Sequence, residues 1–146
     1  MTTAVNANAI PRFVATGVLG TGQVVTANAN YDGTTGTYVT LVTGATNGTR
    51  IDKVMIQAAA TTTAGVIRFF VSNLTGDAAG APTVRMVKEI AQTAATPSGT
   101  VLAFATEWQA TSAANENIFI LESGDILKAS TSNSEAVNLI VLGGDY

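Results

Sequence analysis

The sequence predicts an all-β protein: an antiparallel β-sandwich, jelly-roll-like in its connections, with an extended N-terminal arm. Clusters of Gly, Pro, Asn, Asp and Ser recur at roughly 8–15-residue intervals, which is typical of sandwiches and barrels. The segments between them are rich in β-branched and aromatic residues, and none carries the apolar stripe of an amphipathic helix. A closed barrel is the alternative, because alternation does not separate the two architectures.

About ten short strands are expected, separated by these clusters. The first three cover residues 12–19, 23–28 and 37–43, with glycine-rich breaks at 20–22 and 32–36. The run from Gly17 to Gly22 fits neither nucleotide-binding fingerprint, so we expect a bend between two strands there. The pair Asn47-Gly48 then predicts a tight turn.

The middle strands are predicted over residues 50–58, 66–73, 84–92 and 100–108, because their side chains alternate in character. In the first of them, Ile56 faces one side of the sheet and Met55 the other. In the second, Phe69 lies on an apolar face and Arg68 falls opposite. One buried face and one polar face is the pattern of an antiparallel sheet.

Three more strands are predicted over residues 117–122, 126–131 and 136–142. In the last of these, Val137, Leu139 and Val141 form one row, while Ile140 and Leu142 lie on the opposite side. Both faces are therefore largely apolar. This indicates a central strand, or a strand that is buried in a contact between subunits.

The chain of 146 residues has the length of one domain. Residues 1–11 are predicted to be a separate arm, because the segment is small and polar and ends at Ile10-Pro11, where proline favours extended backbone. Residues 12–146 are predicted to form a single β-sandwich domain. The first nine residues carry no Lys or Arg and no long apolar stretch, so no signal peptide is expected.

Composition argues against most kinds of chemistry. The chain has no Cys and no His, only 12% of its residues are charged, and its net charge is −3. A disulfide framework is excluded, and the scattered basic residues argue against nucleic-acid binding on electrostatic grounds. No apolar run approaches the ~20 residues of a membrane span. We expect no cofactor and no membrane partner, and neutral surface that is readily desolvated against another protein.

An enzyme is not expected, because the residues for nucleophilic or acid–base catalysis are few. Without histidine, Ser130 would need Lys128 as its base, and we expect Lys128 to be an ordinary solvated cross-strand lysine. Asp32, Asp77 and Asp125 each adjoin glycine in a turn, where aspartate is favoured for backbone reasons. Those loops are also too sparse in acids for a calcium site.

A sugar-binding site would need exposed aromatic rings. Tyr31 lies at a turn and is the best candidate for exposure. Trp108 ends a predicted strand, and we expect it to cover the edge of the core, because burial of a large aromatic side chain is strongly stabilising.

The second part of the chain resembles a known group of proteins. The tracts that carry the resemblance are GTRIDKVMI at 48–56, TTTAGVIRFF at 61–70, KEI at 88–90, TPS at 96–98, GDILKASTS at 124–132 and GGDY at 143–146. They resemble small all-β virion structural proteins of tailed bacteriophages, including capsid decoration or cement proteins. The resemblance covers roughly residues 48–146 and consists of turn and strand patterns.

The resemblance implies a structural subunit of the virion, assembled in the bacterial host cytoplasm, that decorates the shell without catalysis. Its partners would be the major capsid protein or other virion proteins, and we expect a homo-oligomer, with a homotrimer favoured. A tail or fibre component, or a receptor-binding module that takes a glycan, is the alternative. The expected interface residues are those of the arm and the chain end: Met1, Thr2, Thr3, Ile10, Pro11 and Tyr146.

Overall fold

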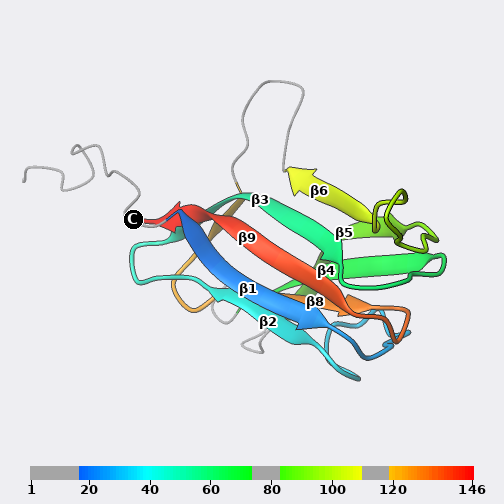
Figure 1. Cartoon of the computed structure of the whole chain (residues 1–146). Helices are drawn as coiled ribbons and strands as arrows, with labels where there is room; N and C mark the ends of the chain where they lie inside the picture. Colours follow the sequence, from blue (N-terminus) through cyan, green and yellow to red (C-terminus); the bar gives the residue numbers. More distant parts are fainter. Residues whose placement is uncertain (1–16, 74–82, 110–118) are drawn as a thin grey trace, which may run out of the picture.

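The computed structural model describes residues 17–73, 83–109 and 119–146, and these form two antiparallel sheets packed face to face (Figure 1). The described residues contain nine strands and no helix. The expected all-β sandwich is therefore confirmed. The expected arm lies outside the described residues.

We call the first sheet the front sheet. Its strand order is β1-β9-β3-β6, and β7 also pairs with β3. β6 pairs with β3 over Lys53 to Gln57, and β7 pairs with it over Thr49 to Ile51, so the two short strands share one edge of β3. The bounds are β1 Val18–Val24, β3 Thr49–Ala58, β6 Ala105–Gln109, β7 Phe119–Leu121 and β9 Val137–Asp145.

The back sheet has the order β2-β8-β4-β5. Its strands are β2 Val39–Thr43, β4 Gly65–Asn73, β5 Thr83–Gln92 and β8 Ile126–Thr131. β5 forms the edge of this sheet and pairs only with β4 among the described strands. The register shifts beside Val87, and the strand exposes Arg85, Lys88 and Glu89. A bulge and several charges are typical of an edge strand that does not pair with other chains.

The core lies between the inner faces of the two sheets. Val54, Ile56 and Leu139 from the front sheet and Ile67 and Phe69 from the back sheet have at most 1% of their surface exposed. Trp108 packs on this core, with its ring centroid 5.1 Å from that of Phe69. The prediction that Trp108 covers the edge of the core is confirmed. The alternation predicted for β3 and β4 holds, with Met55 on the outer face of β3.

The bend expected at Gly20 to Gly22 is wrong. A single strand, β1, continues through these glycines where two strands were predicted, and it pairs with β9 from Val18 to Val24 with a register shift between Val18 and Gly20. A Cβ at position 20 would lie 1.9 Å from the carbonyl oxygen of Leu41, and one at position 22 would lie 2.7 Å from side-chain atoms of Leu41 and Val39. These glycines therefore allow β1 of the front sheet to approach β2 of the back sheet closely, which is a recognised reason for glycine within a strand.

The outer face of the back sheet is covered by the segment 25–38, which joins β1 to β2. Arg68 of β4 has only 4% of its surface exposed and lies beneath this segment. Its guanidinium donates to the carbonyl oxygen of Asn28 at 3.0 Å, to the hydroxyl of Tyr31 at 2.9 Å and to Glu89 at 2.9 Å. The expectation that Arg68 falls opposite the inner face holds, but a second buried layer encloses that side. Tyr38 adds to this layer by packing edge-on against Phe70.

Two other strand boundaries differ from the prediction. Residues 100–104 are outside β6, because Ser98 organises a turn there: its backbone N–H donates to the carbonyl of Val101, and its Oγ accepts from the N–H groups of Thr100 and Val101. β9 continues to Asp145 instead of turning at Gly143, since Gly143 provides a close approach to the Arg50 carbonyl. The tight turn at Asn47-Gly48 is confirmed, with Gly48 at φ 96° and its N–H bonded to Ala45.

Glu135 ties three segments together near one end of the sandwich. Its carboxylate accepts hydrogen bonds from the backbone and hydroxyl of Thr63 and from the buried amide of Gln92. These donors, led by the Thr63 hydroxyl, lower the pKa of Glu135 below its usual range. A folded-state pKa below the unfolded one means that the stabilisation is complete above the unfolded pKa and is lost as the pH falls through the folded pKa.

We therefore expect Glu135→Ala to lower the free energy of unfolding by about 1 kcal/mol at pH 7, with little difference from wild type below the lowered pKa. Urea unfolding at pH 7 and at low pH measures this difference. Glu107→Ala is the control, because Glu107 makes a salt bridge on the surface to Lys53. An equal effect of Glu135→Ala at both pH values would show that the ionised carboxylate is not responsible.

Candidate protein-binding surface

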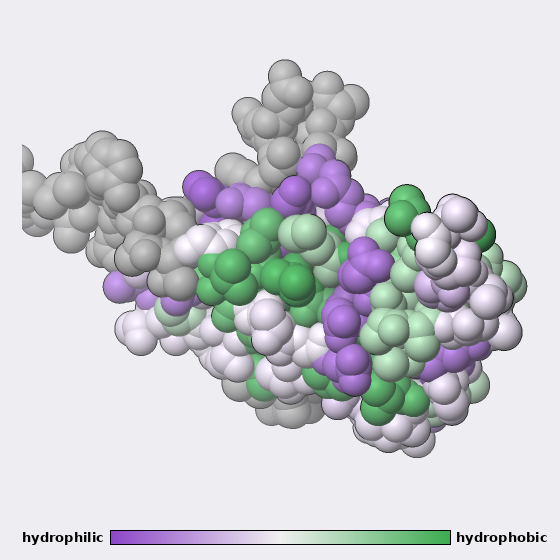
Figure 2. All heavy atoms as spheres, in the orientation of Figure 1, coloured by the Kyte–Doolittle hydropathy of each residue, from purple (hydrophilic) through white to green (hydrophobic). Residues whose placement is uncertain are grey.

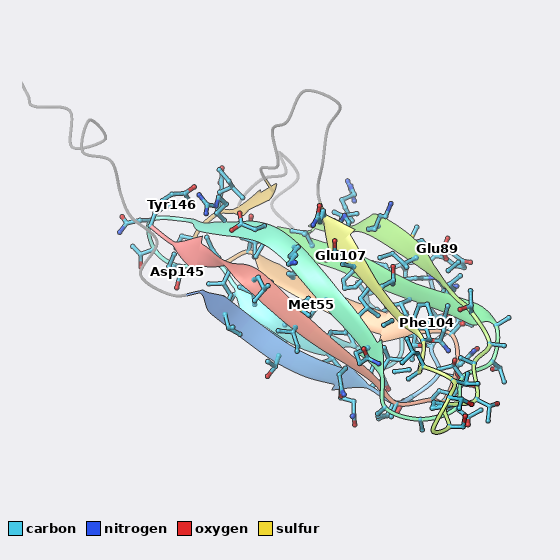
Figure 3. All side chains as sticks on the ribbon, turned by 45° about the horizontal axis from the view of Figure 1, so that its top comes forward. Met55, Glu89, Phe104, Glu107, Asp145 and Tyr146 are labelled. Carbon is cyan, nitrogen blue, oxygen red and sulfur yellow. The ribbon has the colours of Figure 1, made fainter. Side chains whose placement is uncertain are left out.

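The expected interface residues divide into two groups. Met1, Thr2, Thr3, Ile10 and Pro11 lie outside the described residues. Tyr146 follows β9 and is half-buried, and its N–H donates to the carbonyl of Gly48 at 3.1 Å. Tyr146 is thus anchored beside Asp145, which accepts a hydrogen bond from the Thr49 hydroxyl at 2.6 Å (Figure 3). Its role as an interface residue stays a prediction.

Two of the acids considered for chemistry, Asp32 and Asp125, accept hydrogen bonds from the backbone of their own turns, whereas the buried hydroxyl of Ser130 has no hydrogen-bond partner among the described residues. One carboxylate oxygen of Asp32 accepts from the N–H groups of Thr34 and Thr35. The Thr35 hydroxyl, followed by these two N–H groups, holds the pKa of Asp32 well below its usual range. Asp125 accepts from the N–H of Glu122, so both acids stabilise turns as expected. Asp77 lies outside the described residues. Within the described ranges, no group of three or more acids is placed to hold a metal ion.

Lys128 differs from its prediction. It is half-buried, its ammonium donates to the carbonyl of Gly33, and it lies 4.8 Å from the ring centroid of Tyr38. Burial lowers the pKa of Lys128, because the charged form loses solvation. The expectation of a solvated lysine was wrong because the segment 25–38 covers this face. Lys128 instead helps to hold that segment on the back sheet.

Tyr31 is exposed over 60% of its surface, as the sugar-binding alternative requires. However, the guanidinium of Arg68 lies 4.1 Å from the centroid of its ring, so one ring face is already in contact with a cation. Tyr38 and Trp108 are only partly exposed and pack on Phe70 and Phe69. The described residues therefore present Tyr31 as a single aromatic platform, without the cluster of exposed rings that stacking against a sugar chain would favour.

A stronger candidate is the outer face of the front sheet, which no described segment covers. Its middle is apolar: Met55 of β3 lies beside Ile140 of β9, and Leu142 of β9 lies beside Val18 of β1. Val18 is 52% exposed and Met55 42% exposed. We call these four residues the front patch. Figure 2 shows a green area over β3 and β9 in this part of the sheet, and Met55 is labelled in Figure 3.

Polar side chains surround the front patch. On one side, Gln23, Asn138 and Gln57 form a row across β1, β9 and β3, and the amide of Gln23 donates to Asn138 at 2.7 Å. On the β6 side of the patch, Lys53 pairs with Glu107 at 3.2 Å. Both rims are hydrophilic in Figure 2. An apolar centre inside a polar rim is the usual anatomy of a protein–protein interface.

A shallow groove of about 400 Å³ runs across β1 and β9 beside the patch. One wall is formed by Thr21 and Ile140, and the other by Gln23 and Asn138. Gly22 and Leu139 lie between these walls with their side positions directed to the core, so the backbone forms the floor. The sequence predicted that Ile140 and Leu142 form an apolar face, explained either by a central strand or by a contact between subunits. The groove was not predictable, because it depends on how β1 pairs with β9.

A second exposed apolar feature was missed by the sequence prediction. The turn organised by Ser98 presents Val101, 49% exposed, and Leu102, 89% exposed. We call these two residues the tip. It precedes β6 at the end of the sandwich near Phe104, which is labelled in Figure 3. The signal that could have located it is Pro97-Ser98-Gly99, a turn sequence directly before two aliphatic residues.

Comparisons with known proteins leave the family open. No protein-family model matches the chain, and no curated protein sequence matches it significantly. Among the residues that the structure describes, no helix has the length and apolarity needed to cross a membrane.

Proposed function

We propose that the protein is a bacteriophage virion structural protein that decorates the capsid shell and stabilises it without catalysis. The observation that carries the proposal is the front patch, an apolar sheet face with a polar rim that no described segment covers. Monomeric soluble proteins rarely leave such a face without a use. The resemblance of residues 48–146 to virion proteins of tailed bacteriophages points to the same kind of role.

We also infer a jelly-roll connection of the strands. The orders β1-β9-β3-β6/β7 and β2-β8-β4-β5 place successive strands mostly in opposite sheets. If β6 and β7 count as two parts of one strand, the result is eight strands in two four-stranded sheets, as in a jelly roll. Jelly rolls occur in viral capsid proteins and in lectins, so this inference supports the proposal and also its alternative.

The proposed mechanism is passive. A protein that binds only the assembled shell stabilises the shell by mass action, and many copies make weak individual contacts effective together. The low charge density assists, because neutral surface is less costly to desolvate than charged surface. The major capsid protein is the proposed partner, with residues 1–11 as the proposed contact to the shell.

The test is co-sedimentation with shells of the encoding phage that were assembled without this protein. We expect saturable binding of many copies per shell and a large loss of affinity when residues 1–9 are deleted. Thr46→Ala, in an exposed turn, is the matched control and should bind like wild type. Unchanged affinity of the truncated protein would contradict the role of the arm, and no binding by the full chain would contradict the shell proposal.

A glycan-binding tail module is a second candidate, favoured by the exposure of Tyr31. It predicts a signal on a glycan array that is lost in Tyr31→Ala. Tyr31→Phe separates stacking from hydrogen bonding, because it keeps the ring and removes the hydroxyl that Arg68 contacts. Equal array profiles for wild type and Tyr31→Ala would reject this candidate.

A further inference from the structure

We propose that the tip of one copy occupies the front patch and groove of a second copy, in a head-to-tail contact. This inference rests on the proposed function, since it assigns the two surfaces that would join copies of the decoration protein. The contact uses different surfaces on the two partners, so it is heterologous. Contacts of this type close into rings when the rotation between copies allows it, and the expected homotrimer would be such a ring.

The tip is suited to insertion because it is both apolar and held in place. Leu102 is exposed over 89% of its surface, the largest value among the exposed large apolar residues described. The three hydrogen bonds around Ser98 fix the turn that presents it. An ordered projection loses little conformational entropy on binding, so more of its contact energy contributes to affinity.

The groove is suited to receive it. Ile140 forms one wall, Met55 and Leu142 continue the apolar surface beside it, and the amide of Gln23 already donates to that of Asn138. A volume of about 400 Å³ has room for two aliphatic side chains. Gly22 and Leu139 present only backbone to the groove, because their side positions are directed to the core.

The two surfaces can come together without burying an unpaired charge. Residues 93–106, which include the tip, contain no charged side chain. The described ion pair next to the patch, Lys53 with Glu107, is neutral as a pair. No charge therefore has to be desolvated without a partner. A membrane would be a less suitable occupant of the tip, because peripheral binding generally combines apolar residues with a basic cluster.

The alternative contact is face to face, with two front patches related by a two-fold axis. That arrangement would cover both patches and leave Val101 and Leu102 of each copy in solvent. A tip-to-patch contact removes both exposed apolar surfaces from water with one type of interface. The hydrophobic effect favours the arrangement that covers more apolar area.

The absence of cysteine permits a direct test by cross-linking with a short bismaleimide. Leu102→Cys and Ile140→Cys are made as single variants. We expect linked species when the two variants are mixed, and none when either variant is treated alone. Thr46→Cys mixed with Leu102→Cys is the negative control, because position 46 is exposed and belongs to neither surface. Self-linking of Ile140→Cys would establish face-to-face pairing and overturn the proposal.

A second test measures mass by light scattering. We expect Leu102→Asp and Ile140→Asp each to be monomers of 14.8 kDa at concentrations where wild type is oligomeric. Val25→Asp is the matched control, because Val25 is 47% exposed and lies outside both surfaces, so it should remain oligomeric. Mixing the two monomeric variants should restore a dimer, because one retains an intact tip and the other an intact patch.

The outcomes separate this inference from the proposed function. A wild-type protein that is monomeric at all concentrations, or a mixture that does not form dimers, would overturn the tip-to-patch contact. Binding to shells by such a monomer would leave the decoration role standing. Conversely, a tip-to-patch oligomer that does not bind shells would reject the decoration role alone. Flotation with lipid vesicles that is lost in Leu102→Asp would identify a membrane as the occupant and also overturn the contact.

Discussion

Replacement of Gly20 by alanine is expected to lower the free energy of unfolding by at least about 3 kcal/mol, the upper part of the range for overpacked interiors. The reason is steric, because the added Cβ would lie 1.9 Å from the carbonyl oxygen of Leu41. That atom belongs to the backbone of β2, so it cannot move away by a change of rotamer. To accept the methyl group, β1 must separate from β2, and the two sheets lose contact along that side.

Urea unfolding followed by circular dichroism measures this effect. Gly17→Ala is the matched control: it lies just before β1, has no atom within 4 Å of the added Cβ, and should change stability by less than about 0.5 kcal/mol. If Gly20→Ala does not fold, Gly22→Ala provides a milder test of the same close approach, because the added Cβ there would meet only side-chain atoms. Wild-type stability in Gly20→Ala would show that the sheets are not in close contact here.

Replacement of Arg68 by alanine is expected to lower the free energy of unfolding by about 3 kcal/mol, which is the lower end of the range for breaking a buried ion pair. The lower end applies because the Glu89 side chain is 36% exposed and can be hydrated when its partner is removed. The carbonyl of Asn28 and the hydroxyl of Tyr31 would also lose a donor. We expect the segment 25–38 to detach from the back sheet before the whole domain unfolds.

Hydrogen exchange and urea unfolding together measure the two parts of this prediction. The largest acceleration of exchange is expected in the segment 25–38, and a smaller one in the slowest-exchanging core amides, because the global stability is reduced as well. Lys53→Ala is the control, because Lys53 makes a similar ion pair with Glu107 but its side chain is 32% exposed, and its loss should cost less than about 1 kcal/mol. Equal losses of unfolding free energy in the two variants would show that the burial of Arg68 does not determine how much it stabilises the fold.

Local patterns in the sequence were sufficient where burial follows alternation along one strand. β3, β4, β5 and β8 were predicted close to their observed positions, and Trp108 was placed correctly on the core. The front patch was partly predictable, because Met55 and Ile140 are apolar residues on faces opposite the core. The resemblance to phage virion proteins stays a prediction.

The wrong predictions concern residues whose environment is formed by other parts of the chain. Gly20 looks like a strand breaker unless the proximity of β2 is known. Lys128 looks solvated unless the segment that carries Gly33 is known to cover it. Leu102 looked like part of a strand because the apolar residues around it alternate. The turn that exposes Leu102 depends instead on hydrogen bonds to the side chain of Ser98, which no alternating pattern reveals.

The edge of the back sheet has a consequence for the dense packing of copies that the proposed decoration of a shell would require. β5 is ten residues long, and a flat strand of that length would offer neighbours a template for endless cross-β growth. The register of β5 is irregular beside Val87, and the charged side chains of Lys88 and Glu89 point to opposite faces of the sheet. These features interrupt any such growth. High local density can therefore raise the occupancy of specific contacts without converting the protein into fibrils.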